Sequence, residues 1–111
     1  MTPRLTSRMT IDALFRRVQA AGGFAAVLAR GDESAGAILL VCRERGVFKS
    51  LLERTVDLDG GYRWTPCGPQ DLESDSERDG YIQRRRVLDP DLWLIELDVP
   101  DAERFAAESA P

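Results

Sequence analysis

The first hydrophobic pattern in the chain has helical spacing. Apolar residues recur every three or four positions from Ile11 to Val18 and leave the other side of the segment to charged residues. This is the pattern of an amphipathic helix. A Gly-Gly pair follows it, so we expect a helix over residues 10–21 that is capped at its start by Ser7 or Thr10.

Short apolar runs separated by turn residues follow this segment and predict strands. RGDESAG, between the first two runs, has the length of a hairpin turn. A Gly-Gly pair between the third and fourth runs suits a tight turn, and Pro66 suggests that the fourth strand frays or lies at a sheet edge. The four expected strands cover residues 24–30, 37–42, 47–58 and a segment that begins at Tyr62.

The third run alternates between apolar and polar residues. Phe48 and Leu52 fall on one side, polar residues fall on the other, and Leu51 is the exception. Alternation of this kind is typical of a strand with one buried face. We therefore expect a half-buried strand over residues 47–58.

The second half of the chain predicts a helix and then a buried strand. Ser74 and Glu77 form an S-x-x-E capping box, which marks the start of a helix. Asp89 precedes a proline, and a residue in that position avoids the helical conformation. The segment LWLIEL, residues 92–97, is almost continuously apolar, which favours a strand that is covered on both faces.

Together these elements predict an α+β fold. Pro100 and Asp101 suit the first turn of a short final helix, so the order is α-β-β-β-β-α-β-α. We expect a mainly antiparallel sheet of about five strands with the helices packed on one face. The length of 111 residues suits a single domain, 1–111, with a short flexible tail near 106–111.

Charge and hydropathy narrow the class of partner. The formal net charge is -4, which argues against a general polyanion binder but leaves room for a local basic patch. The N-terminal segment has no apolar signal core, and no segment approaches the length of a membrane span. We therefore expect a cytoplasmic protein without a membrane partner.

The chain contains no histidine. This excludes Ser-His-Asp and Cys-His nucleophile pairs and histidine-ligated zinc sites. Cys42 and Cys67 are far apart and form no C-x-x-C motif, so we expect reduced, structural thiols. The composition favours a non-enzymatic protein, and we assign no catalytic residue, no cofactor and no metal ligand.

Two alternative functions rest on charged clusters. Arg16, Arg17 and the run Arg84 to Arg86 suggest contact with nucleic acid, although the acids before the run favour a solvated, salt-bridged helix face. Asp32, Asp89, Asp91 and Glu96 suggest an enzyme that depends on carboxylates and a divalent metal.

The plainer interpretation of these four acids is structural. The aspartates occupy turns, and Glu96 pairs with an arginine or faces solvent.

A protein-binding function is the leading hypothesis. The partner would meet a sheet edge or a surface formed by Trp64 and Trp93, although core packing also explains the two tryptophans. We take the following residues as the candidate binding surface: Asp32, Trp64, Arg84, Arg85, Asp89, Asp91 and Trp93.

Four segments carry a resemblance to a known family. They are RGDESAG with the AILLV run that follows it, YIQRRR, and DPDLWLIELD. On these segments the chain resembles an alphaproteobacterial family of domains of unknown function, number 1491, from Leu5 to Phe105. The resemblance implies a cytoplasmic bacterial protein of one domain, and it brings no activity, cofactor or catalytic residue.

Overall fold

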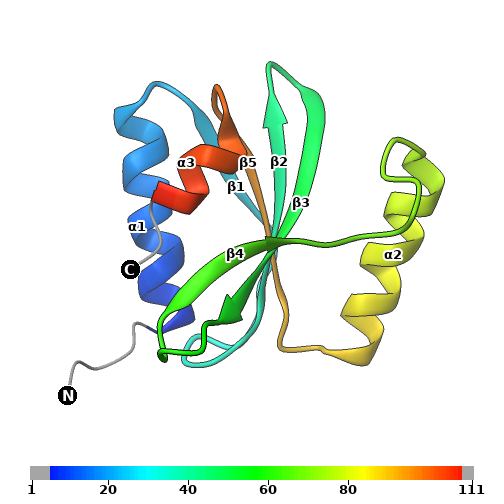
Figure 1. The fold of residues 1–111 in the computed structure, drawn as a ribbon, viewed down its shortest axis with the longest axis horizontal. Coiled ribbons are helices and arrows are strands. Elements are labelled where there is room, and N and C mark those ends of the chain that lie inside the picture. Colours follow the sequence, from blue (N-terminus) through cyan, green and yellow to red (C-terminus); the bar gives the residue numbers. More distant parts are fainter. Residues whose placement is uncertain (1–5, 109–111) are drawn as a thin grey trace.

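The computed structural model describes residues 6–108, which form five strands and three helices (Figure 1). The elements follow the order predicted from the sequence, and the α+β class is confirmed. Within these residues, none of the helices combines the length and the apolar character that a membrane crossing requires. The elements are α1 Ser7–Ala20, β1 Phe24–Ala29, β2 Ile38–Glu44, β3 Val47–Val56, β4 Tyr62–Pro66, α2 Asp75–Leu88, β5 Trp93–Asp98 and α3 Ala102–Glu108.

The five strands form one sheet in the order β1-β5-β2-β3-β4. The predicted hairpin between β1 and β2 is wrong, because β5 lies between them. β5 runs antiparallel to β1 and parallel to β2, and the other neighbouring pairs are antiparallel. A parallel pair needs a long crossover connection, and the chain supplies it through β3, β4 and α2. β1 is therefore left as one edge strand, and β4, as predicted, is the other.

β5 is buried on both faces, as its apolar run predicts. Trp93, Ile95 and Leu97 pack into the core on one side of the sheet. Leu94 and the preceding Leu92 pack into a second core on the other side. Burial on both faces explains why β5 takes an interior position in the sheet.

The helices lie on both faces of the sheet (Figure 1), and the expectation of one covered face is wrong. α1 and α3 bury Leu14 and Ala106 against one face. α2 packs Tyr81 and Ile82 against the other. Two helix layers are required because the interior strands carry apolar residues on both faces, and each apolar face needs a cover.

β3 departs from the predicted alternation. The pairing register between β2 and β3 shifts after Cys42, so that Cys42 pairs with Ser50 and Arg43 with Phe48. The extra residue of such a bulge reverses the side on which later residues point. As a result Phe48 lies with Leu51 on the face covered by α2, whereas Leu52 packs under α1 and α3. The strand is thus buried on both faces at its centre.

Capping residues set the ends of the two long helices. Thr6, not Ser7 or Thr10, caps α1: its hydroxyl accepts a hydrogen bond from the Met9 N–H. The Ser7 hydroxyl donates instead to the carbonyl oxygen of Gly36. The predicted cap of α2 is confirmed, since the Ser74 hydroxyl accepts from the N–H of Glu77.

α2 ends at Leu88 and Asp89 is its C-cap, as the proline after Asp89 predicts. At the C-terminus, α3 runs through residues 102–108, and Ala106 is fully buried in the core. The segment predicted as a tail near 106–111 therefore begins inside a packed helix, and residues 109–111 lie outside the described part of the chain.

Candidate functional site

Asp32 and Asp91 come together through their backbones. The N–H of Asp32 donates to the carbonyl oxygen of Asp91 over 3.0 Å. A Cβ atom added at Gly31 or Gly36 would lie 2.1 or 2.3 Å from that same oxygen. The close approach of the 30–36 loop to Asp91 is possible because both positions lack a side chain.

The carboxylates of Asp32 and Asp89 serve local turns. The Asp32 carboxylate accepts the N–H groups of Ser34 and Ala35, and the Asp89 carboxylate accepts the N–H of Asp91. These are the capping bonds that favour aspartate in turns. Across residues 6–108, no three side chains from histidine, cysteine, aspartate or glutamate gather as a metal-binding group. The geometry therefore gives the hypothesis of a carboxylate-dependent metal enzyme no support.

The two tryptophans do not share an exposed surface. Trp93 is only 1% exposed, and its indole N–H donates to the carbonyl oxygen of Asp32 over 2.7 Å. Trp64, on β4, is half-buried and packs against the same core. The predicted Trp64–Trp93 binding surface is therefore wrong, because Trp93 serves the interior and anchors the loop after β1.

The arginine run on α2 points in three directions. Arg85 reaches the sheet, where its guanidinium binds Glu53 of β3 over 2.5 Å and the Tyr81 hydroxyl over 2.9 Å. The hydrogen bond to Glu53 raises the pKa of Arg85 above its ordinary value. Arg84 is exposed, and Arg86 borders a cavity. The run therefore forms no single basic patch.

Arg16 and Arg17 lie on α1, which packs on the opposite face of the sheet from α2 (Figure 1). They cannot join the α2 arginines in one groove. The geometry does not favour nucleic-acid binding, which needs basic side chains on a shared face.

The remaining ionisable groups of interest are structural. Glu96 binds Arg43 over 2.6 Å between β5 and β2, which confirms the ion-pair interpretation of this residue. Both cysteines are free. Burial raises the pKa of Cys42 to about 11 and also raises that of Cys67, so neither is an activated thiolate.

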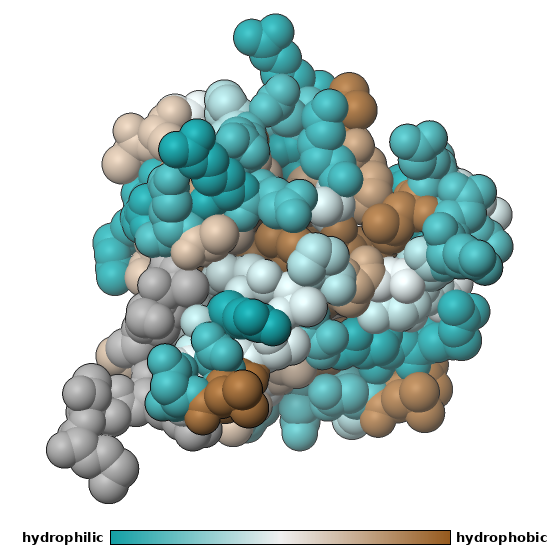
Figure 2. Space-filling view, in the orientation of Figure 1, coloured by the Kyte–Doolittle hydropathy of each residue, from teal (hydrophilic) through white to brown (hydrophobic). Residues whose placement is uncertain are grey.

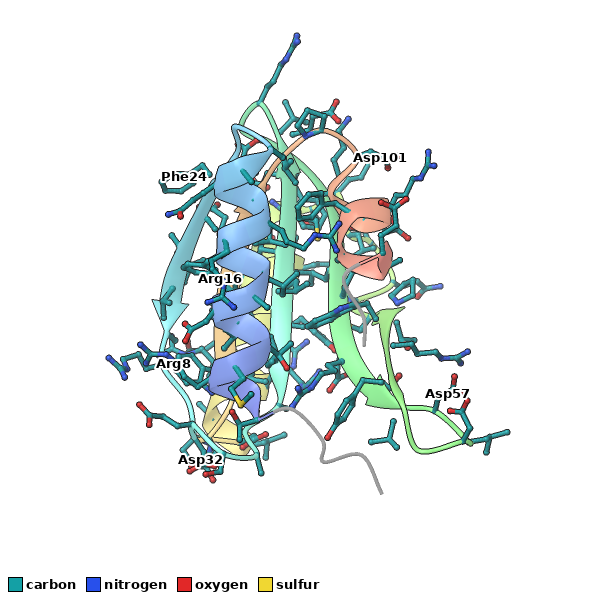
Figure 3. The ribbon with its side chains drawn as sticks, turned by 90° about the vertical axis from the view of Figure 1, so that its left-hand side faces the viewer. Arg8, Arg16, Phe24, Asp32, Asp57 and Asp101 are labelled. Carbon is teal, nitrogen blue, oxygen red and sulfur yellow. The ribbon has the colours of Figure 1, made fainter. Side chains whose placement is uncertain are left out.

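β1 is an edge strand that carries three large apolar side chains open to solvent. Its sequence, FAAVLA, contains no charged residue and no proline. Phe24, Val27 and Leu28 are 58%, 42% and 50% exposed. Figure 3 shows β1 at the free edge of the sheet beside α1, with Phe24 pointing outward. An edge strand without charge or proline lacks two of the features that oppose pairing with another chain, and the bulge after Val27 leaves residues 24–27 as its regular stretch.

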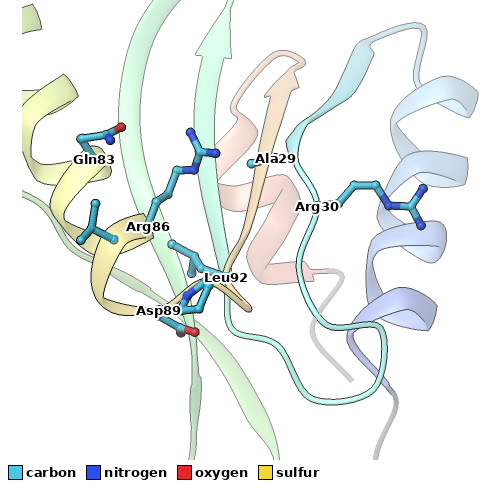
Figure 4. A pocket seen from close by; sticks show the side chains of 8 residues that line it. Ala29, Arg30, Gln83, Arg86, Asp89 and Leu92 are labelled. Carbon is cyan, nitrogen blue, oxygen red and sulfur yellow. The ribbon is translucent and has the colours of Figure 1, made fainter.

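Cavities flank β1 on both faces of the sheet. On the α2 face, a cavity of about 300 Å³ lies between the end of β1, the last turns of α2 and the connection to β5 (Figure 4). On the α1 face, a cavity of about 210 Å³ lies between α1 and β1. Ala29 borders the first cavity, Val27 the second and Arg30 both.

The position of α2 explains why the α2 face is open beside β1. Arg85 ties the helix to Glu53 of β3. Arg78 is almost completely buried and lies 3.9 Å from the ring centroid of Phe48, also on β3. These contacts hold α2 over the β3 half of the sheet, so the β1 half of that face has no helix above it.

The sequence predicts a binding site at a sheet edge but does not identify which edge. The run FAAVLA differs from the β4 run YRWTP in lacking charge and proline, and this difference was visible in the sequence. The two cavities and the position of Arg86 beside one of them could not be predicted from the sequence, because they depend on where α1 and α2 pack on the sheet.

The fold and this edge describe a small α+β protein built on one five-stranded sheet with an open β1 edge. The chain belongs to the DUF1491 family, described as proteins of unknown function, whose model matches residues 5–107. The resemblance seen in the sequence is thereby confirmed. A comparison with curated proteins found no match.

Three solved structures are similar to the chain. An NMR structure of a DUF1491 family protein from Caulobacter crescentus CB15 has a TM-score of 0.76 at 29% identity and covers 95% of this chain and 94% of that one. A crystal structure of a DUF1491 family protein from the same organism has a TM-score of 0.75 at 30% identity, with coverages of 92% and 94%. The solution structure of protein Atu0922 from A. tumefaciens has a TM-score of 0.68 at 33% identity, with 87% of each chain covered.

Proposed function

We propose that this protein is a non-enzymatic interaction domain that binds a partner protein by strand pairing along β1. The observation that carries the proposal is an exposed, uncharged, proline-free edge strand with a cavity on each face. In strand addition, main-chain hydrogen bonds supply affinity, and pockets for alternate side chains supply specificity. β1 and its two cavities offer both elements.

We further propose that the protein acts in a bacterial cytoplasm. The structural relatives with a stated source come from bacteria. Cys42 and Cys67, the only cysteines of the chain, are both free, which suits a reducing compartment.

The proposal is tested by charging the β1 edge. Lysine on an edge strand opposes pairing with another chain, so the double variant Phe24→Lys, Leu28→Lys should lose the partner. Val47→Lys is the matched control, because Val47 is an equally exposed apolar residue outside β1. Tagged wild-type protein and both variants would be used to capture partners from extract of the source cells, with quantification by mass spectrometry.

A protein retained by the wild type and by V47K but at least tenfold depleted with the double variant would support the proposal. Equal retention by all three would show that binding, if present, does not use β1. The circular dichroism spectrum of each variant would verify that the sheet is intact.

A further inference from the structure

The two cavities beside β1 differ in the chemistry of their lining residues. This difference indicates which side chains a partner segment bound along β1 would place in them. On the α1 face, the cavity is lined by three charged residues, Arg8, Asp12 and Arg30, and by four apolar ones: Ile11, Phe15, Val27 and Trp93. The charged side chains at its rim neutralise one another. Arg8 binds Asp12 over 3.2 Å and Glu33 over 3.5 Å, and Glu33 also binds Arg30 over 3.3 Å.

The α2-face cavity has an arginine without an acidic partner. Arg86 borders it together with Gln83 and Val87. Among residues 6–108, no hydrogen bond or ion pair engages the Arg86 guanidinium. Figure 4 shows this side chain extending from α2 over the sheet, while Arg30 points away toward α1. A free guanidinium offers five N–H donors in a planar fork that matches a carboxylate.

Asp89 does not neutralise Arg86, although both border the cavity. Its carboxylate accepts the N–H of Asp91 over 3.1 Å, and no ion pair joins it to Arg86 within the described residues. In Figure 4 the Asp89 carboxylate points away from Arg86. The last turn of α2 favours a positive charge at this position, but it leaves the guanidinium donors open to a ligand.

From this contrast we infer that the partner segment that pairs with β1 is an extended peptide with an acidic side chain for Arg86 and an apolar side chain for the α1-face cavity. This inference rests on the proposed function and specifies its partner. Successive side chains of a strand point to opposite faces. The acidic and apolar residues must therefore be adjacent in the peptide or separated by an even number of residues.

The peptide would gain a charge-assisted, two-pronged contact on one face and apolar burial on the other. Arg86 is exposed, so the carboxylate–guanidinium contact has the strength of a surface ion pair. Replacing the acidic residue of a bound peptide by its amide should therefore weaken binding by about two- to fivefold. The same change in a peptide bound to an Arg86→Gln variant should have little effect.

A phage-displayed library of random ten-residue peptides would test the inference. The library would be selected separately on the wild type, on Arg86→Glu and on Arg84→Glu. Arg84 is an exposed arginine of the same helix that does not border the cavity, so R84E controls for the change in net charge. We expect several-fold enrichment of Asp or Glu next to an apolar residue on the wild type and on R84E, and enrichment of Lys or Arg at that position on R86E.

The outcomes separate this inference from the proposed function. Peptides that lose binding to the Phe24→Lys, Leu28→Lys variant but show no acidic preference, or keep that preference on R86E, would overturn the acidic-peptide inference and leave strand pairing at β1 standing. Peptides that bind the double variant as well as the wild type, or the absence of any enriched peptide, would overturn both.

Discussion

The sheet ends in two edge strands of different character, β1 and β4. β4 carries Arg63 and ends at Pro66, and its Trp64 packs into the core. Thr65 of β4 hydrogen-bonds Thr55 of β3 over 2.7 Å. β1 has no charge and no proline; its one irregularity is a bulge after Val27, a feature that also limits pairing.

The surroundings of β4 are also more completely covered than those of β1. Figure 2 views the molecule from the side on which β4 lies, where hydrophilic residues cover most of the surface and hydrophobic ones show between them. β4 leads through residues 67–74 to α2, which covers the β3 half of one face. β1 has a cavity on each face instead. This protein therefore covers the β4 edge with polar and packed residues and leaves the β1 edge available for contact.

The largest expected effect on the free energy of unfolding comes from a substitution in β4, compared with one in β1. Trp64→Ala removes a large ring that packs against the core, and it should lower the free energy of unfolding by about 3 kcal/mol. Leu28→Ala, at an exposed site of β1, should lower it by less than about 1 kcal/mol. Urea denaturation of both variants measures the difference. Equal losses would mean that β1 is as deeply integrated into the fold as β4.

A second prediction concerns the interior between the edges. The pKa of Cys42 is raised from 9.0 to about 11 in the folded protein, so the folded state holds this proton more tightly than the unfolded state. The stabilisation is complete below pH 9 and is lost as the pH rises to 11, by about 2 to 3 kcal/mol.

Urea denaturation of the wild type and of Cys42→Ala between pH 8 and pH 11 isolates this contribution, because other titrating groups affect both proteins equally. The difference in stability between the two proteins should narrow across this range. A constant difference would show that the Cys42 thiol titrates normally.

The third prediction tests the ion pair between Arg85 and Glu53, which helps to hold α2 over the β3 half of the sheet. Arg85→Ala leaves the partly buried Glu53 without its partner and should destabilise the protein by about 1 to 2 kcal/mol, between the values for exposed and buried ion pairs. Arg84→Ala, one residue earlier and exposed, should stay within about 0.5 kcal/mol of the wild type. Thermal unfolding of the two variants makes the comparison, and identical melting temperatures would contradict the anchoring role.

The smallest expected effect on the free energy of unfolding comes from a substitution at β1 that should nevertheless reduce binding. Phe24→Lys should change the free energy of unfolding by less than about 0.5 kcal/mol, because Phe24 is largely exposed. The same substitution should reduce partner capture. A loss of stability well above that value would mean that the exposed ring supports the fold and that reduced capture reports partial unfolding.

Local patterns determined most of the elements from the sequence alone. Periodicity identified the helices and strands because a buried face must repeat with the period of its own backbone. Ser74 and Asp89 marked the ends of α2, since capping and the proline restriction act over a few residues. The chain also excluded histidine-based chemistry, and Glu96 was expected to pair with an arginine or to face solvent because an unpaired buried charge is costly.

Tertiary structure alone decided how these elements meet. The insertion of β5 between β1 and β2 depends on burial across the whole sheet, which no local window contains. The bulge that turns Phe48 away from Leu52 arises from pairing with β2. The partner of Arg85 and the free position of Arg86 follow from where α2 rests on the sheet. The candidate site is therefore a product of long-range packing: the sequence determined that β1 is an uncharged strand, and the arrangement of β5, α1 and α2 left it exposed between two cavities.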